Sequence, residues 1–153
     1  MIKEFKRNNG FLSNFHECLI KFEGMFYSSA EAAYQASKTL DFDIRDDFTY
    51  MTSKEAKEKA KNLRVRNDWD DVKVDNMRKI LMDKFTRHKN LRNELVKTKD
   101  QILIEGNNWH DNFWGDCFCK KCKDIKGKNM LGKLLMEVRE EVKDKRIKWR
   151  KDL

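Results

Sequence analysis

The alternation of apolar and polar residues along the chain predicts mostly helices, with a few short strands. A helix is expected where apolar residues recur every three to four positions, and a strand where they alternate or form a short run. The longest helical period runs from about Asn67 to His88 and places five apolar side chains on one face: Trp69, Met77, Ile80, Leu81 and Phe85. Residues 129–145 follow the same period with Leu131, Leu134, Leu135, Val138 and Val142.

Local signals predict the remaining elements. The spacing Ser28–Glu31, followed by three alanines, is typical of a capping box and predicts a helix over 28–40. Thr52–Glu55 repeats that spacing before residues 54–63, and residues 91–98 predict a shorter helix. Residues 16–28 read as two short strands around Glu23-Gly24. A short strand is expected at 2–5, a loop at 10–15 and a buried strand at 101–106.

These elements predict an α+β fold, in which helices dominate and the sheet is small. The chain has no proline, no Gly/Ser-rich linker and no internal repeat. We therefore expect one domain over 1–153, with its core at about 4–142 and a charged helix end at 143–153. The N-terminus lacks the apolar region of a signal peptide, and no apolar run is long enough to span a membrane. A cytoplasmic protein is expected.

The net positive charge of the chain has two interpretations. Lys and Arg number 34 and Asp and Glu 26, which gives a formal net charge of +8. Basic and acidic residues are interleaved along the whole length, so a well-hydrated surface explains the pattern. The alternative is attraction to an anionic partner, either a phosphate-bearing small molecule or a nucleic acid.

Three cysteines gather at Cys117, Cys119 and Cys122. Zinc sites normally use four protein ligands, so a fourth would have to be His110, His16 or Cys18. The alternative is a loop that uses small, buried thiols. We expect no metal, because the sequence shows one ligand too few.

Glu31 belongs to a candidate polar pocket. On its predicted helix, Glu31, Tyr34, Gln35 and Lys38 share a face, because their spacing is i, i+3, i+4 and i+7. Glu31 either closes the capping box back to Ser28 or lines a pocket with its neighbours.

The long helix contains lysines in its apolar stripe. Lys73 and Lys84 fall at the phase of the apolar residues, where lysine is rarely buried without a partner. They either extend their ammonium groups to solvent or point into a site and hold a phosphate. Arg64 and Arg66, just before the helix, are candidates for bidentate phosphate contacts.

Asp111 lies three residues before Trp114, and Gly115 follows. A carboxylate beside an aromatic wall suits a flat heterocycle attached to a sugar, with the ring stacked on the wall. Core packing of the tryptophans is the alternative.

Taken in order, several blocks of the chain resemble the NADAR family, also called YbiA-like. The resemblance covers residues 4–142, and its blocks are GFLSNF (10–15), YSSAEAAYQASKT (27–39), RNDWDDVKVDNM (66–77), KF (84–85), LIE (103–105), DNFWG (111–115) and GKNMLGKLLMEVR (127–139). Ala32 and Ala33 depart from the bulkier or histidine residues that often follow the glutamate. The cysteine-rich insert after Gly115 is found in one branch only.

The resemblance implies an N-glycosidase that needs no cofactor and no metal. Its implied substrates are phosphorylated ribosylaminopyrimidines, intermediates of riboflavin synthesis, which yield ribose 5-phosphate and the base. The alternative is removal of ADP-ribose from nucleic acid or another ADP-ribose-derived substrate, and a binding module without turnover is a third possibility. Glu31 and Asp111 would be catalytic. The substrate would be bound by Trp69, Trp114, Tyr34, Ser13, Asn14, Lys38, Arg66, Lys73 and Lys84.

Overall fold

Two compact units make up the chain in the computed structural model, which describes residues 1–143. The central unit comprises Asn14–His88, and the terminal unit joins Met1–Ser13 to the chain from Lys89 onward. Apart from Lys143, the charged end expected at 143–153 lies outside the described residues. The single domain expected over 1–153 stays a prediction. Helices and short strands are combined in both units, which confirms the α+β fold class.

The central unit begins with the predicted hairpin. Strand β1 (Glu17–Phe22) pairs antiparallel with β2 (Met25–Ser29). Both turn residues have positive φ, 45° at Glu23 and 85° at Gly24. Glycine adopts this conformation without steric cost, which explains why the turn falls here.

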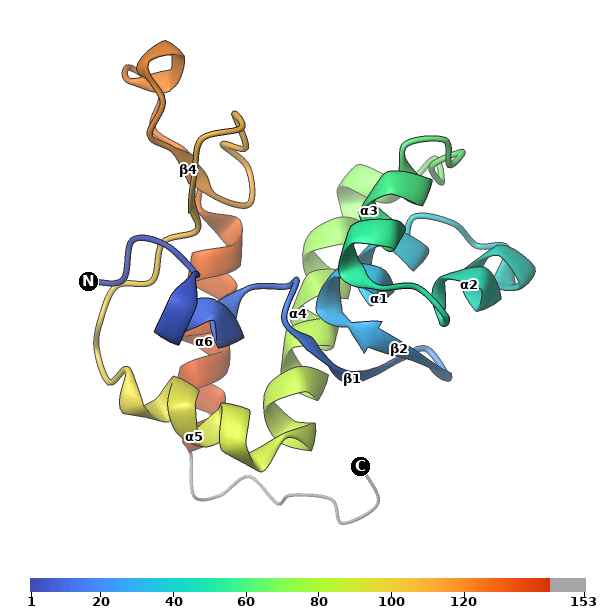
Figure 1. Cartoon of the computed structure of the whole chain (residues 1–153), viewed down its shortest axis with the longest axis horizontal. Helices are drawn as coiled ribbons and strands as arrows, with labels where there is room; N and C mark the ends of the chain where they lie inside the picture. The colour runs from blue at the N-terminus through green and yellow to red at the C-terminus, as the bar shows by residue number, and fades with distance from the viewer. Residues whose placement is uncertain (144–153) are drawn as a thin grey trace. The chain divides into compact units, whose positions relative to one another are not determined.

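Helix α1 (Ala30–Ala36) follows β2 directly, and all seven of its residues are buried. It contacts both strands of the hairpin and three helices, α2 (Phe42–Phe48), α3 (Ser53–Ala60) and α4 (Trp69–Arg87). Figure 1 shows α1 within this group of elements. Four of the seven residues are alanines, and their small side chains allow neighbours to approach the helix from every side. The long predicted helix corresponds to α4, in which four of the five predicted apolar residues are buried and Trp69 is half-buried.

Helix α2 was not expected from the sequence. Asp41 caps its N-terminus by accepting hydrogen bonds from the backbone N–H groups of Asp43 and Ile44. Its Arg45 is buried, donates from Nε to the Thr39 carbonyl oxygen (2.8 Å) and lies over the Phe42 ring, 4.9 Å from its centroid. Local capping and one buried cation therefore hold this short helix.

One of the two predicted capping boxes is confirmed and the other is wrong. Thr52 and Glu55 form a reciprocal capping box at α3. At α1 the cap is Ser29, whose hydroxyl accepts from the Ala32 backbone N–H (3.1 Å). The Ser28 hydroxyl instead donates to the Met51 carbonyl oxygen. Because the helix begins one residue later than predicted, Glu31 does not occupy the capping-box position.

In the terminal unit, the two predicted helices are present as α5 (Lys89–Lys97) and α6 (Met130–Lys143), which pack on each other. All five apolar residues predicted to face the core are buried. Arg139 is also buried, and it donates to Thr98 Oγ1 (3.0 Å) and the Gln101 carbonyl oxygen (2.9 Å). The predicted loop at 10–15 begins instead as a 3₁₀ helix, η1 (Arg7–Leu12).

The strands of this unit are shorter than predicted. Residues 2–5 and 101–105 are joined by a single parallel bridge, between Ile2 and Leu103, in place of two strands, and Gly106 begins β3. The regular pairing is a parallel two-residue ladder between β3 (Gly106–Asn107) and β4 (Asp116–Cys117).

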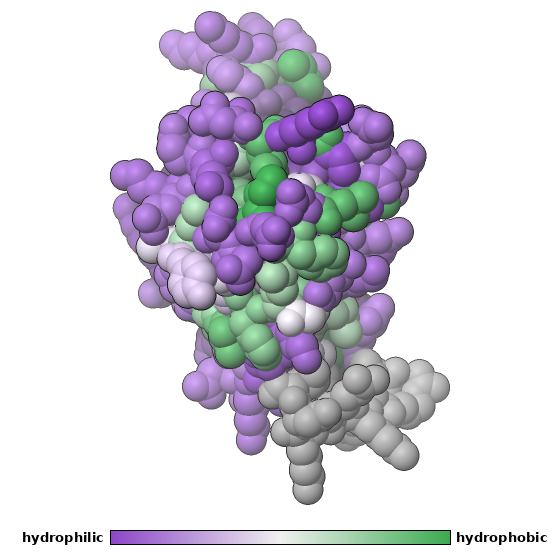
Figure 2. Space-filling view, turned by 90° about the vertical axis from the view of Figure 1, so that its right-hand side faces the viewer, coloured by the Kyte–Doolittle hydropathy of each residue, from purple (hydrophilic) through white to green (hydrophobic). Residues whose placement is uncertain are grey.

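Charged and polar side chains cover much of the face in Figure 2, around a band of apolar ones. This surface agrees with the interleaved charges of the sequence. Within residues 1–143, none of the helices combines the length and apolar character that a membrane span requires.

Lys84 on α4 is fully buried, at 0% exposure. Burial lowers the pKa of Lys84 from 10.5 to about 8, and the Cys18 side chain opposes that shift. Below about pH 8 the ammonium is charged in both the folded and the unfolded protein, so its burial costs stability. Above 10.5 the amine is neutral in both, and that cost disappears.

We therefore expect the stability difference between Lys84→Met and the wild type to shrink as pH rises through this window. The lysine's contribution should change by on the order of 3 kcal/mol. Urea unfolding of both proteins at a series of pH values measures it. Lys73→Met is the matched control, because Lys73 pairs with Asp70 at 3.0 Å and keeps part of its side chain exposed. A stability difference that stays constant across the window would contradict the burial of an ionisable lysine.

Candidate active site

A buried carboxylate lies on α1 of the central unit. Glu31 is 8% exposed, and its Oε1 accepts a hydrogen bond from Gln35 Nε2 at 2.8 Å. Its backbone N–H donates to the Asn14 carbonyl oxygen (3.0 Å). The capping box is excluded for Glu31, because Ser29 takes the capping role, and its place in a pocket stays a prediction.

Two aromatic rings and an ammonium group belong to the same cluster. The Tyr34 and Trp69 rings have centroids 5.4 Å apart and planes inclined by 56°. Lys38 Nζ lies 5.3 Å from the Tyr34 centroid and 5.9 Å from that of Trp69. The predicted helix face of α1 is confirmed, and Trp69 joins it from the start of α4.

Both burial and the Glu31 carboxylate affect the pKa of Lys38. Burial lowers the pKa of Lys38, and the negative charge of Glu31 opposes that shift. The cluster therefore places a cation and an anion in a partly desolvated environment, where their interaction is stronger than in water.

Four buried side-chain polar atoms of the central unit have no hydrogen-bond partner among the described residues: Asn14 Oδ1, Gln35 Oε1, Arg45 Nη2 and Asn76 Nδ2. A buried polar atom without a partner costs free energy, so such atoms are suited to binding polar groups of a ligand. Asn14 also contacts Met77, from its Nδ2 to the sulfur at 3.5 Å. Asn76 was not among the site residues predicted from the sequence, although its place in the apolar phase between Lys73 and Ile80 was a usable signal.

Arg66 is held close to this cluster. Its backbone N–H donates to the Lys38 carbonyl oxygen (2.8 Å), and its guanidinium makes a bidentate pair with Asp68 at 2.6 and 2.9 Å. A surface cavity of about 480 Å³ adjoins it, lined by Thr39, Leu40, Asp41, Arg64, Val65, Arg66, Asn67 and Asp68. Arg64 and Arg66 thus border a space large enough for a phosphate. Arg66 is already paired with Asp68.

The other two predicted phosphate-binding lysines lie on α4. Lys73 pairs with Asp70 (3.0 Å), and Lys84 is buried, with Cys18 among the groups that affect its charge. Ring and ammonium contacts bring Tyr34, Lys38 and Trp69 together, and the charge of Glu31 acts on Lys38. Backbone hydrogen bonds join Asn14 to Glu31 and Arg66 to Lys38.

In the terminal unit, the Asp111 carboxylate organises a tight turn. Its Oδ1 accepts from the backbone N–H groups of Phe113 (3.1 Å) and Trp114 (2.9 Å). Buried Asn107 holds the other side of Asp111, by accepting from its N–H and donating to its carbonyl oxygen. Gly115 follows where a Cβ atom would lie 2.2 Å from the Glu105 carbonyl oxygen, so only glycine fits.

Ser13 and Trp114 also belong to the terminal unit. Ser13 ends η1, with its backbone N–H donating to the Gly10 carbonyl oxygen (3.0 Å). The Trp114 indole packs edge-on against the Phe113 ring, with centroids 4.8 Å apart.

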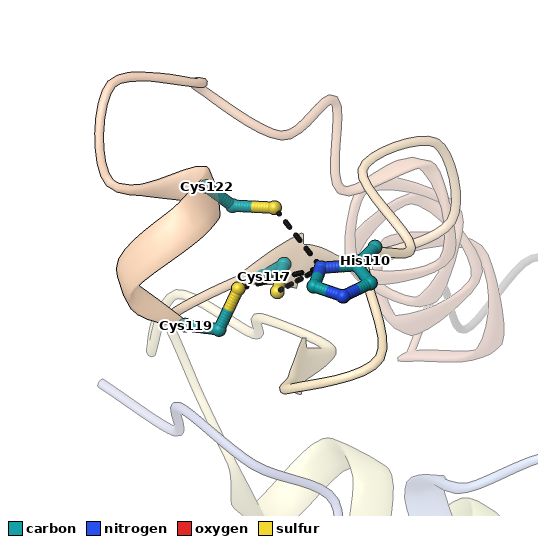
Figure 3. Close-up of side chains that lie close together, drawn as sticks. All are labelled: His110, Cys117, Cys119 and Cys122. Carbon is teal, nitrogen blue, oxygen red and sulfur yellow. Dashed lines mark hydrogen bonds between the residues drawn. The ribbon is translucent and has the colours of Figure 1, made fainter.

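The cysteine cluster acquires the fourth ligand atom that the sequence count lacked. His110 Nδ1 lies 3.3 Å from Cys119 Sγ, 3.4 Å from Cys122 Sγ and 3.9 Å from Cys117 Sγ (Figure 3). The other two candidate ligands, His16 and Cys18, belong to the central unit. His110 thus supplies the fourth ligand atom, and the cluster has the four protein ligands that a zinc site normally uses.

Comparison with known proteins identifies the relatives of this chain. The N-glycosidase YbiA of Escherichia coli is 36% identical over 138 residues, which are 87% of this chain and 81% of YbiA. An N-glycosidase of Nostoc punctiforme is 35% identical over 88% of this chain and 86% of its own length. A riboflavin biosynthesis protein of Vibrio vulnificus is 35% identical over 90% of this chain, which spans only 36% of that longer protein.

A solved structure and a family profile also match this chain. The NMR structure of E. coli YbiA superposes with a TM-score of 0.78 at 32% identity, covering 94% of this chain and 87% of YbiA. The NADAR domain profile matches residues 2–143. The chain belongs to the NADAR family.

Proposed function

We propose that this protein is an N-glycosidase that hydrolyses a phosphorylated N-riboside and releases ribose 5-phosphate and the free base. The observation that carries the proposal is the buried Glu31 carboxylate, which has no capping role and lies with Gln35, Lys38 and an aromatic pair. Support comes from the family, because curated relatives covered over most of their length are named N-glycosidases.

Glu31 has the chemistry that this reaction requires. Cleavage of an N-glycosidic bond builds positive charge on the anomeric carbon, and a nearby carboxylate stabilises that charge or activates the attacking water. Gln35 holds the carboxylate in place from one turn later on the same helix. The buried setting strengthens its interaction with the developing cation.

Substrate binding follows from the neighbours of Glu31. The Tyr34 and Trp69 rings offer flat surfaces for the base, and the unpartnered atoms of Asn14, Gln35 and Asn76 suit sugar hydroxyls or exocyclic amines. Lys38 and Arg66 are the cations placed to attract the phosphate. Ser13, Lys73 and Lys84 keep the substrate-binding roles predicted from the sequence, and all three lie in blocks that resemble the NADAR family.

The second carboxylate of the proposal is Asp111, with Trp114 as an aromatic wall. We assign to Asp111 the complementary task, to bind sugar hydroxyls or protonate the leaving group. This assignment is supported by the DNFWG block and by the turn at Asp111, in which Oδ2 takes no part in the two bonds made by Oδ1.

A second candidate function is removal of ADP-ribose from a nucleic acid. Its supporting observation is the net charge of +8, which favours contact with a polyanion. The same carboxylate chemistry would apply, because the bond cleaved is again at an anomeric carbon. A module that binds these ligands without turnover is the third possibility.

Glu31→Gln tests the catalytic carboxylate. The amide has the same shape and can still accept from Gln35, so the fold should persist while kcat falls by about 10³-fold. Base release from a ribosylaminopyrimidine phosphate, followed by chromatography, measures the effect, and thermal unfolding monitors the fold.

Glu55→Gln is the matched control for this experiment. Glu55 also lies in the first turn of a helix, but it is exposed, and glutamine can complete its capping box with Thr52. This variant should keep wild-type kcat. Wild-type kcat in Glu31→Gln would refute the catalytic role, as would a loss that merely tracks a lower melting temperature.

The substrate class is tested by offering three substrates to the wild-type protein. We expect turnover of the ribosylaminopyrimidine phosphate, and a rise in KM of about 10- to 100-fold for its dephosphorylated form, because charged hydrogen bonds to the phosphate are lost. Activity only on ADP-ribosylated DNA would favour the second function. Tight binding of these substrates with no turnover of any of them would support a binding module without catalytic activity.

A further inference from the structure

One side-chain cluster of the terminal unit has no role in the proposed glycosidase reaction. The ligand atoms of His110, Cys117, Cys119 and Cys122 all lie within 4.8 Å of one another. Figure 3 shows the three sulfur atoms converging on the same nitrogen of the His110 ring. We propose that these four residues bind one structural zinc ion.

The spacing of the four atoms is close to that of a tetrahedral zinc site. Zinc binds sulfur at about 2.3 Å and imidazole nitrogen at about 2.0–2.1 Å, which places tetrahedral ligands roughly 3.5–3.8 Å apart. The three distances from His110 Nδ1 to the sulfurs, 3.3, 3.4 and 3.9 Å, straddle that range. All four ligand atoms lie within 4.8 Å of one another, so the widest pair would have to close by no more than about 1 Å.

Hydrogen bonding alone does not account for this arrangement. A single imidazole nitrogen carries at most one proton, so it can donate to one sulfur and not to three. As an acceptor it has one lone pair, which the three thiols would have to share. A cation at the centre satisfies all four atoms at once, because the sulfurs bind as thiolates and the nitrogen as a lone-pair donor.

The backbone around the cluster is built to present these ligands. Cys117 ends β4, and its backbone N–H donates to Asn112 Oδ1 (2.9 Å). Cys119 precedes the single turn η2 (Lys120–Cys122) and Cys122 ends it, and the Cys122 N–H donates to the Cys119 carbonyl oxygen (3.1 Å). This turn gives the Cys-x-x-Cys spacing typical of structural zinc sites.

His110 is delivered by an unusual backbone conformation. Its φ is 69°, in the left-handed region that costs energy for a residue with a side chain. Asn107 accepts from the N–H groups of its two neighbours, Trp109 (3.2 Å) and Asp111 (3.1 Å), and so fixes the loop that carries the ring. The ring is exposed in the chain but directed at the thiols, which a bound ion would explain.

Ligand type selects the metal and its role. Three thiolates and one imidazole are a soft donor set that favours zinc over magnesium or calcium. With four protein ligands no coordination position is left for water or substrate, so the ion is structural. All cysteines of the described chain are free thiols, and three of them are thus available as ligands.

Metal content of the purified protein tests the proposal, which does not depend on the N-glycosidase assignment. Protein expressed with added zinc and purified without chelator should contain about one zinc per chain by plasma mass spectrometry. Cys119→Ser and Cys122→Ser should lose most of it. Cys18→Ser is the matched control, since this thiol lies outside the cluster, and it should retain the metal.

Two further variants keep the test decisive if a serine variant fails to fold. His110→Ala should weaken zinc binding by at least about tenfold in competition with a chelator, whereas His110→Cys should restore it as a four-thiolate site. Cobalt in place of zinc should give the visible bands of a tetrahedral thiolate site in the wild type and in His110→Cys. Zinc-free protein after supplementation, or equal zinc affinity of wild type and His110→Ala in the chelator competition, would overturn the proposal, as would a disulfide among the three cysteines in reduced preparations.

Discussion

The burial of α1 is the constraint on which the central unit depends. A helix of seven residues surrounded by a hairpin and three other helices keeps little exposed surface, and none of its side chains is more than 8% exposed. Its alanines make close packing possible, and its polar residues must find partners inside the protein. Glu31 and Gln35 do so with each other, four residues apart on the helix. The hydrogen bond from Gln35 to Glu31 therefore has two roles. It satisfies polar groups buried by the packing of α1, and it positions the proposed catalytic carboxylate.

The sequence predicted the elements whose pattern is local and strong. The periods behind α4 and α6, the turn at Glu23-Gly24 and the capping box at Thr52 are each encoded within a few residues, and all are present. Helix α2 was missed because its seven residues carry no clear apolar period and rest on capping and on buried Arg45. The strand expected at 101–106 was wrong in extent, since pairing depends on a partner segment that lies about a hundred residues earlier.

The candidate site divides in the same way. The shared face of Glu31, Tyr34, Gln35 and Lys38 follows from helical spacing alone. Whether Glu31 capped the helix depended on a shift of one residue, which no pattern fixes, and the hydroxyl of Ser29 decides it. Asn76 was overlooked because a single asparagine in an apolar stripe has no motif of its own. His110 was one of three possible ligands because its position depends on a positive φ and on hydrogen bonds to Asn107.

The zinc site and the carboxylate turn are physically coupled within the terminal unit. Asp111 directly follows His110, and Asn107 accepts from the Asp111 N–H. Asn112, one residue further, accepts from Cys117. A closed Cys3His site offers zinc no substrate position, so the ion acts on this turn only by holding its backbone. The energy of metal binding would then offset the strain at His110 and the entropy of ordering an otherwise exposed loop. The cysteine insert would therefore not be a second active centre. It would stabilise the backbone of the segment that carries Asp111 and Trp114.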